Sequence, residues 1–203
     1  MGLCSKKTDL KIKTPDSQAN LLLCIIDWQK FFVDPKSPVF IPASEKVKVN
    51  LAHLLNLFHE FNALIAATRH SNSDNSPNSF LRFYGRVLSR NSVWFDLSPP
   101  IAGLKSIKIF DKETYSAFEN PAFADFLVAN RIRIIVLAGV QTDKCILANS
   151  LNAFDKGYQI IVIEDACCAR LPEGHFFALS IIERSCGRVI KTKDLISLVK
   201  KNA

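Results

Sequence analysis

The sequence predicts a three-layer α/β/α domain, with a mostly parallel, six-stranded Rossmann-like sheet that carries helices on both faces. Six short apolar runs recur along the chain, and continuous runs of this kind are typical of strands buried on both faces. Segments with apolar residues at helical spacing separate the runs, and this alternation indicates a parallel sheet covered by helices. The predicted strands are residues 21–26, 63–67, 107–110, 134–138, 160–163 and 189–190.

The helices between these strands are predicted from apolar spacing and from capping residues. Residues 44–61 carry apolar side chains three or four positions apart, which is the pattern of a helix with one buried face. Asn120 precedes Pro121 in the order preferred for an N-cap and the first helical position. Residues 145–154 and 175–184 form two further apolar-faced helices, and a glycine follows each of them.

Composition predicts one compact domain. The chain has 203 residues, of which 48% are hydrophobic and 22% charged, and this balance is ordinary for a globular protein. We expect residues 19–203 to form the domain and residues 1–18 to form a flexible N-terminal tail. No apolar run reaches the roughly eighteen residues that a membrane-spanning helix needs, so we expect no membrane partner.

The charge and the cysteines bear on partners and compartment. The formal net charge is +7, but the lysines are scattered and concentrated at the two ends rather than interleaved with aromatic residues. We interpret this charge as a solvated basic surface and expect no nucleic-acid partner. The six cysteines show no metal-ligand CxxC spacing and several lie in apolar runs, which favours reduced thiols and a cytoplasmic location.

Three titratable residues stand where parallel strands are expected to end. Asp27 follows the first strand, Lys112 follows the third, and Cys145 begins the helix after the fourth. Ligand sites of such sheets lie at the carboxyl ends of the strands, so these side chains could meet over one crevice. A helix N-terminus and a nearby cation stabilise a thiolate, and a carboxylate can accept the thiol proton. Loss of Asp27 is accordingly expected to slow alkylation of Cys145.

Each of these residues also has an ordinary structural explanation when it is taken singly. Asp27 could cap a strand end, Lys112 could be a surface charge, and Cys145 could be a small apolar core residue. Residue type and position alone leave this alternative open.

Residues 71–100 form an unusually long connection that is rich in Asn, Ser and Pro. Connections of this length in compact domains are usually functional, so we expect this segment to help form the wall of the active site. Arg82, Arg86 and Arg90 recur every four residues within it and would share one face of a helix. They are interpreted either as a solvated face or as a clamp for a substrate carboxylate or a neighbouring subunit.

Three blocks of sequence resemble signature blocks of the isochorismatase-like cysteine hydrolases, a superfamily that contains nicotinamidases and N-carbamoylsarcosine amidohydrolases. The blocks read IDWQKFF at residues 26–32, KETYSAF at residues 112–118 and AGVQTDKC at residues 138–145. Further similarity follows toward the C-terminus, and the resemblance covers most of the chain from residue 20 to residue 195. It implies the same three-layer fold.

The resemblance also implies a role for each residue of the trio. Asp27 would be the general base, Lys112 the cation that orients Asp27 and holds the thiolate, and Cys145 the nucleophile. A cis peptide bond is implied between Val140 and Gln141, with the backbone amides of Gln141 and Cys145 forming an oxyanion hole. The implied reaction is a two-step acyl transfer that cleaves an amide-type C–N bond through a thioester, with no cofactor.

Pocket and supporting residues follow from the same comparison and from position. Phe32 matches the aromatic residue that follows the aspartate in the family, and Tyr115 and Arg69 are the other side chains expected in the substrate pocket. Asp143 is expected to fix backbone near the site. His175 begins a late helix and receives no catalytic role.

One departure from the family concerns its metal site. Nicotinamidases carry an Asp and a His in a T-x-D-x-H block after the second strand, whereas this block reads TRHSN at residues 68–72. The aspartate and the histidine of the pattern are both replaced, and His70 is the only histidine in the segment, so His70 with Asp74 would be a thin ligand set for zinc. We therefore predict no catalytic metal, which disfavours nicotinamide as the substrate.

Two other functions stay open at this point. The chain could be a catalytically silent member of the fold that binds a small ligand, or it could be a nicotinamidase proper. The intact trio argues against the first alternative, and the altered metal block argues against the second. In each case the partner is a small molecule, and the resemblance implies a homo-oligomer, either a dimer or a tetramer.

Overall fold

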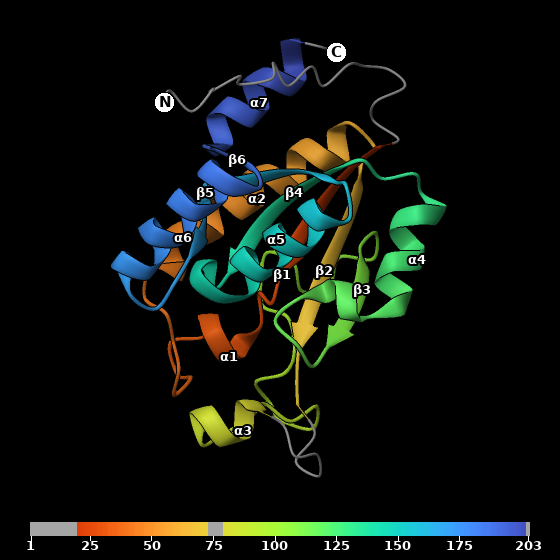
Figure 1. Ribbon diagram of the computed structural model, residues 1–203. Coiled ribbons are helices and arrows are strands. Elements are labelled where there is room, and N and C mark those ends of the chain that lie inside the picture. The colour runs from red at the N-terminus through yellow and green to blue at the C-terminus, as the bar shows by residue number, and fades with distance from the viewer. Residues whose placement is uncertain (1–19, 73–78, 202–203) are drawn as a thin grey trace, which may run out of the picture.

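Six strands form one sheet in the computed structural model, which describes residues 20–72 and 79–201 (Figure 1). The strand order is β3-β2-β1-β4-β5-β6, and each neighbouring pair of these strands is parallel. The predicted fold class is confirmed, and the sheet is more regular than the mostly parallel one predicted. The tail expected at residues 1–18 lies outside the described residues. The strands are β1 (Leu21–Ile26), β2 (Leu64–His70), β3 (Lys108–Lys112), β4 (Ile134–Val140), β5 (Gln159–Cys168) and β6 (Arg188–Ile190).

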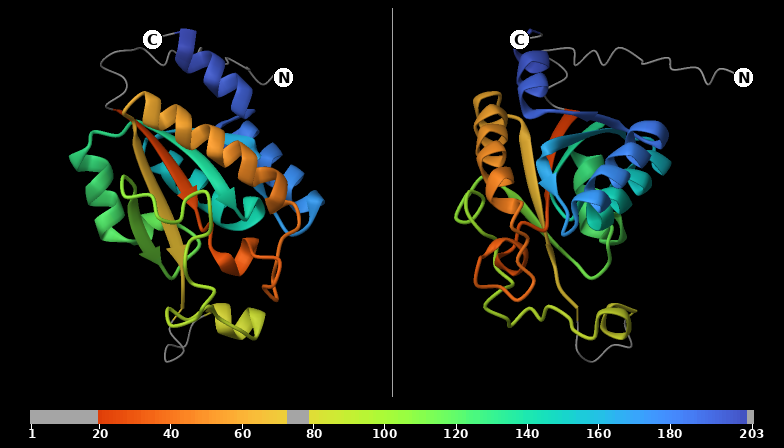
Figure 2. Two further views of the ribbon diagram at one scale, coloured as in Figure 1. Left: turned by 180° about the vertical axis from the view of Figure 1, so that it is seen from behind. Right: turned by 90° about the vertical axis from the view of Figure 1, so that its left-hand side faces the viewer.

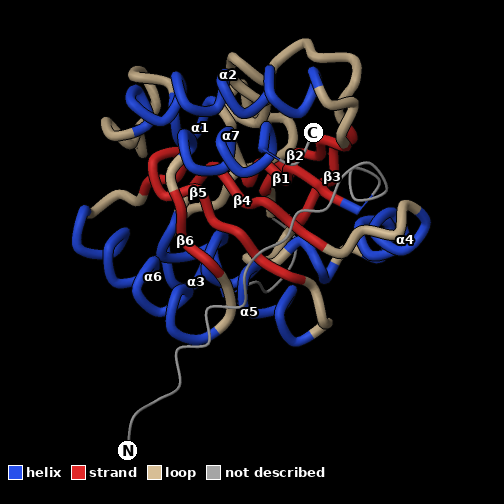
Figure 3. Tube along the Cα trace, turned by 90° about the horizontal axis from the view of Figure 1, so that it is seen from above, coloured by secondary structure: helices blue, strands red, loops and turns tan. Residues whose placement is uncertain are grey.

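Helices cover both faces of the sheet, as the sequence predicts. Figure 3 shows α2 and α7 on one side of the strands and α5 and α6 on the other, and Figure 2 shows the same layers from two further sides. The helical elements are α1 (Lys30–Val33), α2 (Ser44–Glu60), α3 (Ser79–Tyr84), the 3₁₀ turn η2 (Ala117–Glu119), α4 (Pro121–Ala129), the π-helical turn η3 (Thr142–Ile146), α5 (Leu147–Asp155), α6 (Pro172–Ser185) and α7 (Thr192–Lys201).

The core divides into two clusters, one on each face of the sheet. On β1, Leu23 belongs to the cluster that includes Phe58 of α2, whereas the neighbouring Leu22 belongs to the cluster that includes Ile182 of α6. Successive side chains of a strand point to opposite faces, so a strand covered on both sides is apolar at every position. This is why the strands are continuous apolar runs in the sequence.

The helix ends agree with the predicted caps in one case and shift in another. Asn120 caps α4, because its side-chain Oδ1 accepts the backbone N–H of Ala122 at 2.9 Å. Helix α6 begins at Pro172, three residues before its predicted start, since proline suits the first turn of a helix. Helix α7 was not predicted, although Leu195 and Val199, four residues apart, are buried.

The carboxyl ends of β1, β2 and β3 lie at one edge of the sheet, on the same side as α1 and α3 (Figure 1). Strand β1 pairs with β2 on one side and with β4 on the other. Strands β2 and β3 are therefore added to one side of β1, and strands β4 to β6 to the other side, so the order of the strands reverses at β1. A crevice at such a reversal is the usual ligand site of parallel α/β sheets. In the described part of the chain, no helix combines the length and the apolar composition needed to cross a membrane.

Candidate active site

The trio predicted from the sequence meets at this edge of the sheet. Lys112, the last residue of β3, donates from Nζ to Oδ2 of Asp27 at 2.7 Å, and the same Nζ lies 3.5 Å from Sγ of Cys145. Lys112 also donates to the carbonyl oxygen of Thr114 at 3.0 Å. All three members of the trio are buried, so their charges interact with little solvent screening. None of the three is a surface charge or a simple strand cap.

A threonine on β2 holds Asp27 in place. The hydroxyl of Thr68 donates to Oδ1 of Asp27 at 2.7 Å and accepts the backbone N–H of Asp27 at 3.1 Å. Asp27 itself has a φ of 49°, in the left-handed region that aspartate tolerates better than most residues. Sequence reasoning missed Thr68, although a polar residue directly after the predicted apolar strand at residues 63–67 was a signal for it.

The protonation of Cys145 differs from the thiolate expected from the sequence. Burial raises the pKa of the Cys145 thiol to about 12, and the Asp27 carboxylate acts in the same direction while Lys112 opposes both. Burial works to lower the pKa of Lys112, but Asp27 and Cys145 outweigh it and the pKa is raised. Burial thus favours the neutral thiol of Cys145 over its thiolate before a substrate binds.

The turn that carries the thiol follows β4 directly. The Val140–Gln141 peptide bond is cis, at the place where the resemblance implied it. Gln141 then leads into η3, and its side-chain Oε1 accepts Nζ of Lys144 at 3.1 Å. Within β4, Gly139 has a φ of 112° and faces Ile26 of β1 so closely that a Cβ would overlap the Ile26 carbonyl oxygen. A glycine is needed here because β1 and β4 approach each other tightly beneath the site.

Asn149 ties the thiol-bearing turn to the segment after β3, and sequence reasoning did not single it out. Its side-chain Nδ2 donates to the carbonyl oxygens of Cys145 at 2.7 Å and Tyr115 at 3.1 Å, while Oδ1 accepts the N–H of Ala117 at 2.9 Å. A buried asparagine with three bonds of this kind fixes two chain segments relative to each other.

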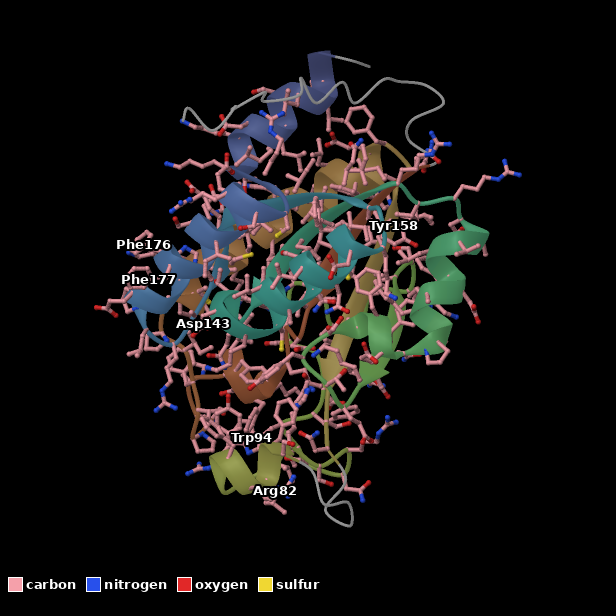
Figure 4. The ribbon with its side chains drawn as sticks, in the orientation of Figure 1. Arg82, Trp94, Asp143, Tyr158, Phe176 and Phe177 are labelled. Carbon is pink, nitrogen blue, oxygen red and sulfur yellow. The ribbon has the colours of Figure 1, made fainter. Side chains whose placement is uncertain are left out.

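Helix α6 supports the same turn from its other side. His175 shares a hydrogen bond of 2.8 Å between its Nδ1 and Oγ1 of Thr142, three residues before the thiol. Asp143 packs against Gly174, where a Cβ would lie 2.9 Å from Oδ2 of Asp143. Figure 4 shows Asp143 near the end of α6 that meets η3. His175, which received no catalytic role from the sequence, thus contacts the turn that carries the nucleophile candidate.

A cavity of about 290 Å³ opens above Cys145. This volume lies near the lower end of the range for ligand pockets, roughly 300–1,000 Å³. Phe32, Tyr115, Gln141 and Cys145 line the cavity, as expected. Asp27 and Lys112 lie behind Cys145 and do not line it, and neither does Arg69.

Arg69 instead points to the other side of β2. Its guanidinium donates to both carboxylate oxygens of Asp111, at 2.7 and 3.1 Å, and lies 4.4 Å from the centre of the Phe95 ring. Thr68 and His70, on either side of it in the strand, face the site, so the alternation of a strand turns Arg69 away. The expected pocket role of Arg69 is therefore wrong.

The long segment after β2 covers the cavity, as its length predicted. Phe80 and Tyr84 of α3 line it, and the hydroxyls of Tyr84 and Tyr115 lie 2.7 Å apart. The ring of Phe80 lies 4.7 Å from that of Tyr115 and 4.9 Å from that of His70, between ring centres. Aromatic residues of this segment thus build one wall of the cavity.

The three arginines of this segment do not share a helix face. Helix α3 ends at Tyr84, so only Arg82 is helical, and Figure 4 shows Arg82 at α3, at the far end from α7. Arg86 lines the cavity, whereas Arg90 donates to Oδ2 of Asp111 at 3.1 Å. Arg82 is thus exposed to solvent, Arg86 faces the cavity and Arg90 forms an ion pair.

Comparison with known proteins decides the family. The isochorismatase domain profile matches residues 21–194. The chain belongs to the isochorismatase family. Maleamate amidohydrolase of Pseudomonas putida is 26% identical over 188 residues, which are 88% of this chain and 86% of that protein. Isochorismatase domain-containing protein 2 of Xenopus laevis is 31% identical over 99 residues, 49% of this chain, and the match spans only 48% of that protein's length.

A solved structure shares the fold of this isochorismatase-family chain. The cysteine hydrolase from Pseudomonas syringae pv. phaseolicola superposes with a TM-score of 0.86 at 20% identity, and the match covers 92% of this chain and 95% of that one. At this identity the likeness concerns the fold alone.

The metal block of this isochorismatase-family protein offers few ligands. Nε2 of His70 lies 2.8 Å from Oδ1 of Asn72, and burial together with Lys112 lowers the pKa of the His70 ring. Asp74, its conceivable partner, lies outside the described residues. In residues 20–72 and 79–201, no group of three or more His, Cys, Asp or Glu side chains could hold a metal ion. Metal independence stays a prediction.

Proposed function

We propose that the chain is a cysteine hydrolase that cleaves an amide-type C–N bond of a small molecule through a thioester intermediate. One observation carries the proposal: the Lys112 ammonium contacts both the Asp27 carboxylate and the Cys145 sulfur, and Cys145 lines a cavity. A buried thiol next to a carboxylate and a cation is suited to nucleophilic attack on a carbonyl. The maleamate amidohydrolase among its relatives supports the choice of an amide over another acyl bond.

The first chemical step transfers the thiol proton as the carbon–sulfur bond forms. Since the pKa of Cys145 is raised to about 12, very little thiolate is present before the substrate binds, and Asp27 accepts the proton during the attack. Lys112 stabilises the negative charge that remains near the sulfur and the carboxylate. The substrate carbonyl oxygen receives hydrogen bonds from the backbone amides of Gln141 and Cys145, which form the proposed oxyanion hole.

The remaining steps return the site to its starting state. The tetrahedral intermediate collapses, the C–N bond breaks, and the leaving nitrogen takes the proton from Asp27 and departs as ammonia or an amine. Water then attacks the thioester while Asp27 accepts one of its protons, and the carbon–sulfur bond breaks to release a carboxylic acid. Cys145 recovers its proton from Asp27. The reaction consumes only the amide and one water molecule, and it involves no oxidation or reduction.

The proposal is tested by ammonia release from a panel of small amides, ureas and carbamoyl compounds. We expect turnover of at least one compound, its loss in Cys145→Ala, and its retention in Cys186→Ala, which removes a buried thiol that does not line the cavity. Intact-mass spectrometry of the quenched reaction should reveal an acyl adduct on the parent. Turnover that survives in Cys145→Ala would overturn the proposal. Ligand binding without ammonia release from any amide would favour the silent binding alternative.

We also propose a cytoplasmic location, and the cysteines support it. The five cysteines in the described residues are all free and all buried. Chains in oxidising compartments more often pair their cysteines in disulfides.

A further inference from the structure

The turn that carries Cys145 has little support of its own. It is the π-helical turn η3, and its N-cap residue Gln141 makes no side-chain capping hydrogen bond. The carbonyl oxygen of Gln141 accepts two backbone N–H groups, from Lys144 at 3.2 Å and from Ile146 at 3.1 Å. Turns of this kind are rare and occur frequently at functional sites. Contacts from outside η3 therefore contribute to the position of the Cys145 sulfur.

Two such contacts lie on either side of Cys145 in the sequence. Asn149 of α5 donates to the carbonyl oxygen of Cys145 itself at 2.7 Å. On the other side, His175 of α6 shares a hydrogen bond of 2.8 Å with the hydroxyl of Thr142. Thr142 is fully buried, and in the described part of the chain its hydroxyl has no hydrogen-bond partner other than His175. The start of the turn is thus tied to α6 by one side-chain bond.

A close contact joins α6 to the same turn at the next residue. A Cβ on Gly174 would lie 2.9 Å from Oδ2 of Asp143, so the Asp143 side chain fills the space beside this glycine. Gly174 belongs to the first turn of α6, and the first N–H groups of a helix lack partners inside it and attract a carboxylate. Leu171, the N-cap residue of α6, supplies no side-chain cap. The start of α6 and the start of η3 therefore stabilise each other.

The bonded pair acts at a distance from the cavity. Neither His175 nor Thr142 lines the cavity above Cys145. An effect of this pair on the reaction must therefore pass through the backbone of η3. That backbone sets the 3.5 Å approach of Lys112 to the Cys145 sulfur and carries one amide of the proposed oxyanion hole. A displacement of about 1 Å at such a site can cost about 10²-fold in rate.

We propose that His175 is a positioning residue, which holds Thr142 and thereby keeps Cys145 in place for attack on the amide carbon. The proposal rests on the proposed function. A residue of this kind affects the chemical step more than substrate binding, because it fixes the nucleophile and is not part of the cavity wall. Burial lowers the pKa of the His175 ring, so the ring is neutral at neutral pH and a neutral side chain can take its place.

The first experiment needs no substrate and measures the restraint on Cys145 directly. Alkylation by iodoacetamide is followed at each cysteine by peptide mass spectrometry. Loss of the bond to α6 should reduce the burial of Cys145, and burial is the main cause of its raised pKa. We therefore expect alkylation of Cys145 to be about tenfold faster in His175→Ala. Cys24 and Cys167, which are buried in β1 and β5, are the internal control and should react as in the parent.

Two further variants separate the hydrogen bond from damage to the helix. His175→Asn should react like the parent, because its side-chain amide can keep a hydrogen bond to Thr142. Phe177→Ala is the matched control, since it truncates an exposed ring on the same helix, and it should also react like the parent. An unchanged rate at Cys145 in His175→Ala would overturn the proposal. An equal rise at Cys24 would overturn it as well, because it would reflect opening of the whole fold.

Thr142→Val tests the other partner of the bond. It removes the hydroxyl and should raise alkylation of Cys145 as His175→Ala does. The double variant should react no faster than either single variant, because both substitutions remove the same interaction. Effects that multiply in the double variant would show that the two residues act separately, which contradicts the proposed pairing.

The second experiment uses an amide that the parent hydrolyses. We expect His175→Ala to lower kcat about tenfold with KM unchanged, and His175→Asn to retain most of the parent's kcat. Lower thermal stability with an unchanged kcat, or a change in KM alone, would overturn the positioning role and leave the hydrolase intact. If the parent hydrolyses no amide, the proposed function loses support, and the alkylation rates still decide whether His175 restrains Cys145.

Discussion

The hydroxyl of Thr68 forms two hydrogen bonds with Asp27: it donates to carboxylate Oδ1 at 2.7 Å and accepts the backbone N–H of Asp27 at 3.1 Å. The carboxylate thus has Thr68 on Oδ1 and Lys112 on Oδ2. This arrangement fixes the direction from which Asp27 can accept a proton. Thr68 is therefore a positioning residue, which acts on the reaction through Asp27.

Thr68→Val is expected to lower kcat by about 10- to 100-fold and to destabilise the fold by about 1–3 kcal/mol, because it leaves a buried carboxylate oxygen and an N–H unsatisfied. Thr68→Ser keeps the hydroxyl, so it should retain most of the parent's kcat and most of its stability. Steady-state kinetics and urea unfolding check the two effects. A loss of stability without a change in kcat or in its pH profile would reduce Thr68 to a structural residue.

Asp27→Asn should separate two effects of the carboxylate. Hydrolysis should fall by about 10²–10⁴-fold, since the amide cannot accept the thiol proton. Alkylation of Cys145 should become faster at a fixed pH near neutrality, because Asp27 contributes to the raised pKa of Cys145 and its loss leaves burial alone to oppose Lys112. This direction is opposite to the one expected from the sequence. Slower alkylation in Asp27→Asn would show that Asp27 also serves as the base toward alkylating agents.

Some features were predictable because their signals are local. Strands covered on both faces are apolar at every position, and Asn120 before Pro121 marks a helix start, so sheet and caps could be derived from the sequence. The trio was found because the ends of parallel strands share one edge. Thr68 and Asn149 were also within reach, as polar residues in buried positions.

Other features depend on contacts that no local pattern encodes. Arg69 was misplaced because the predicted strand ended at residue 67, before the alternation that turns Arg69 away, and because the sequence does not reveal that Asp111 lies beside it in the β2–β3 register. His175 contacts η3 only through the packing of α6. The raised pKa of Cys145 comes first from burial, which is a property of the assembled core rather than of neighbouring residues in sequence.

Gly139→Ala should be among the most destabilising single changes in the sheet. The new Cβ would overlap the Ile26 carbonyl oxygen, and the φ of 112° is unfavourable for alanine, so we expect a loss of about 3 kcal/mol or more. Gly103→Ala is the control, since Gly103 has a φ of 83° but open space around it. It should cost only the backbone strain, about 1 kcal/mol. Equal losses in urea unfolding would mean that the strands separate to admit the methyl group.

The free energy of unfolding should fall as the pH rises above about 9. Burial, and after it Asp27, raises the pKa of Cys24 from 9.0 to about 12. Below pH 9 the thiol is protonated in both states, whereas between 9 and 12 only the unfolded chain releases its proton. The loss is about 1.4 kcal/mol per pH unit for each such thiol.

Cys24→Ala is expected to reduce this slope, measured by urea unfolding at several pH values with reductant present. Data between pH 6 and 8 serve as the control, because there the difference between variant and parent should not change with pH. Identical slopes above pH 9 would show that Cys24 does not control the alkaline loss of stability.

Activity should survive dialysis against a strong chelator, and elemental analysis should find no stoichiometric metal. The expectation rests on the ligands that the block at residues 68–72 supplies, where His70 stands in place of the aspartate of the family pattern, Asn72 stands in place of its histidine, and the two are hydrogen-bonded to each other. A catalytic zinc site usually takes three protein side chains and a water, and residues 20–72 and 79–201 contain no group of three or more His, Cys, Asp or Glu side chains that could hold a metal ion. His70→Gln is the informative variant, because it should leave metal content unchanged while altering the cavity wall. Stoichiometric zinc in the parent that His70→Gln abolishes, with activity restored by added zinc after chelation, would overturn this expectation and make nicotinamide the first substrate to test.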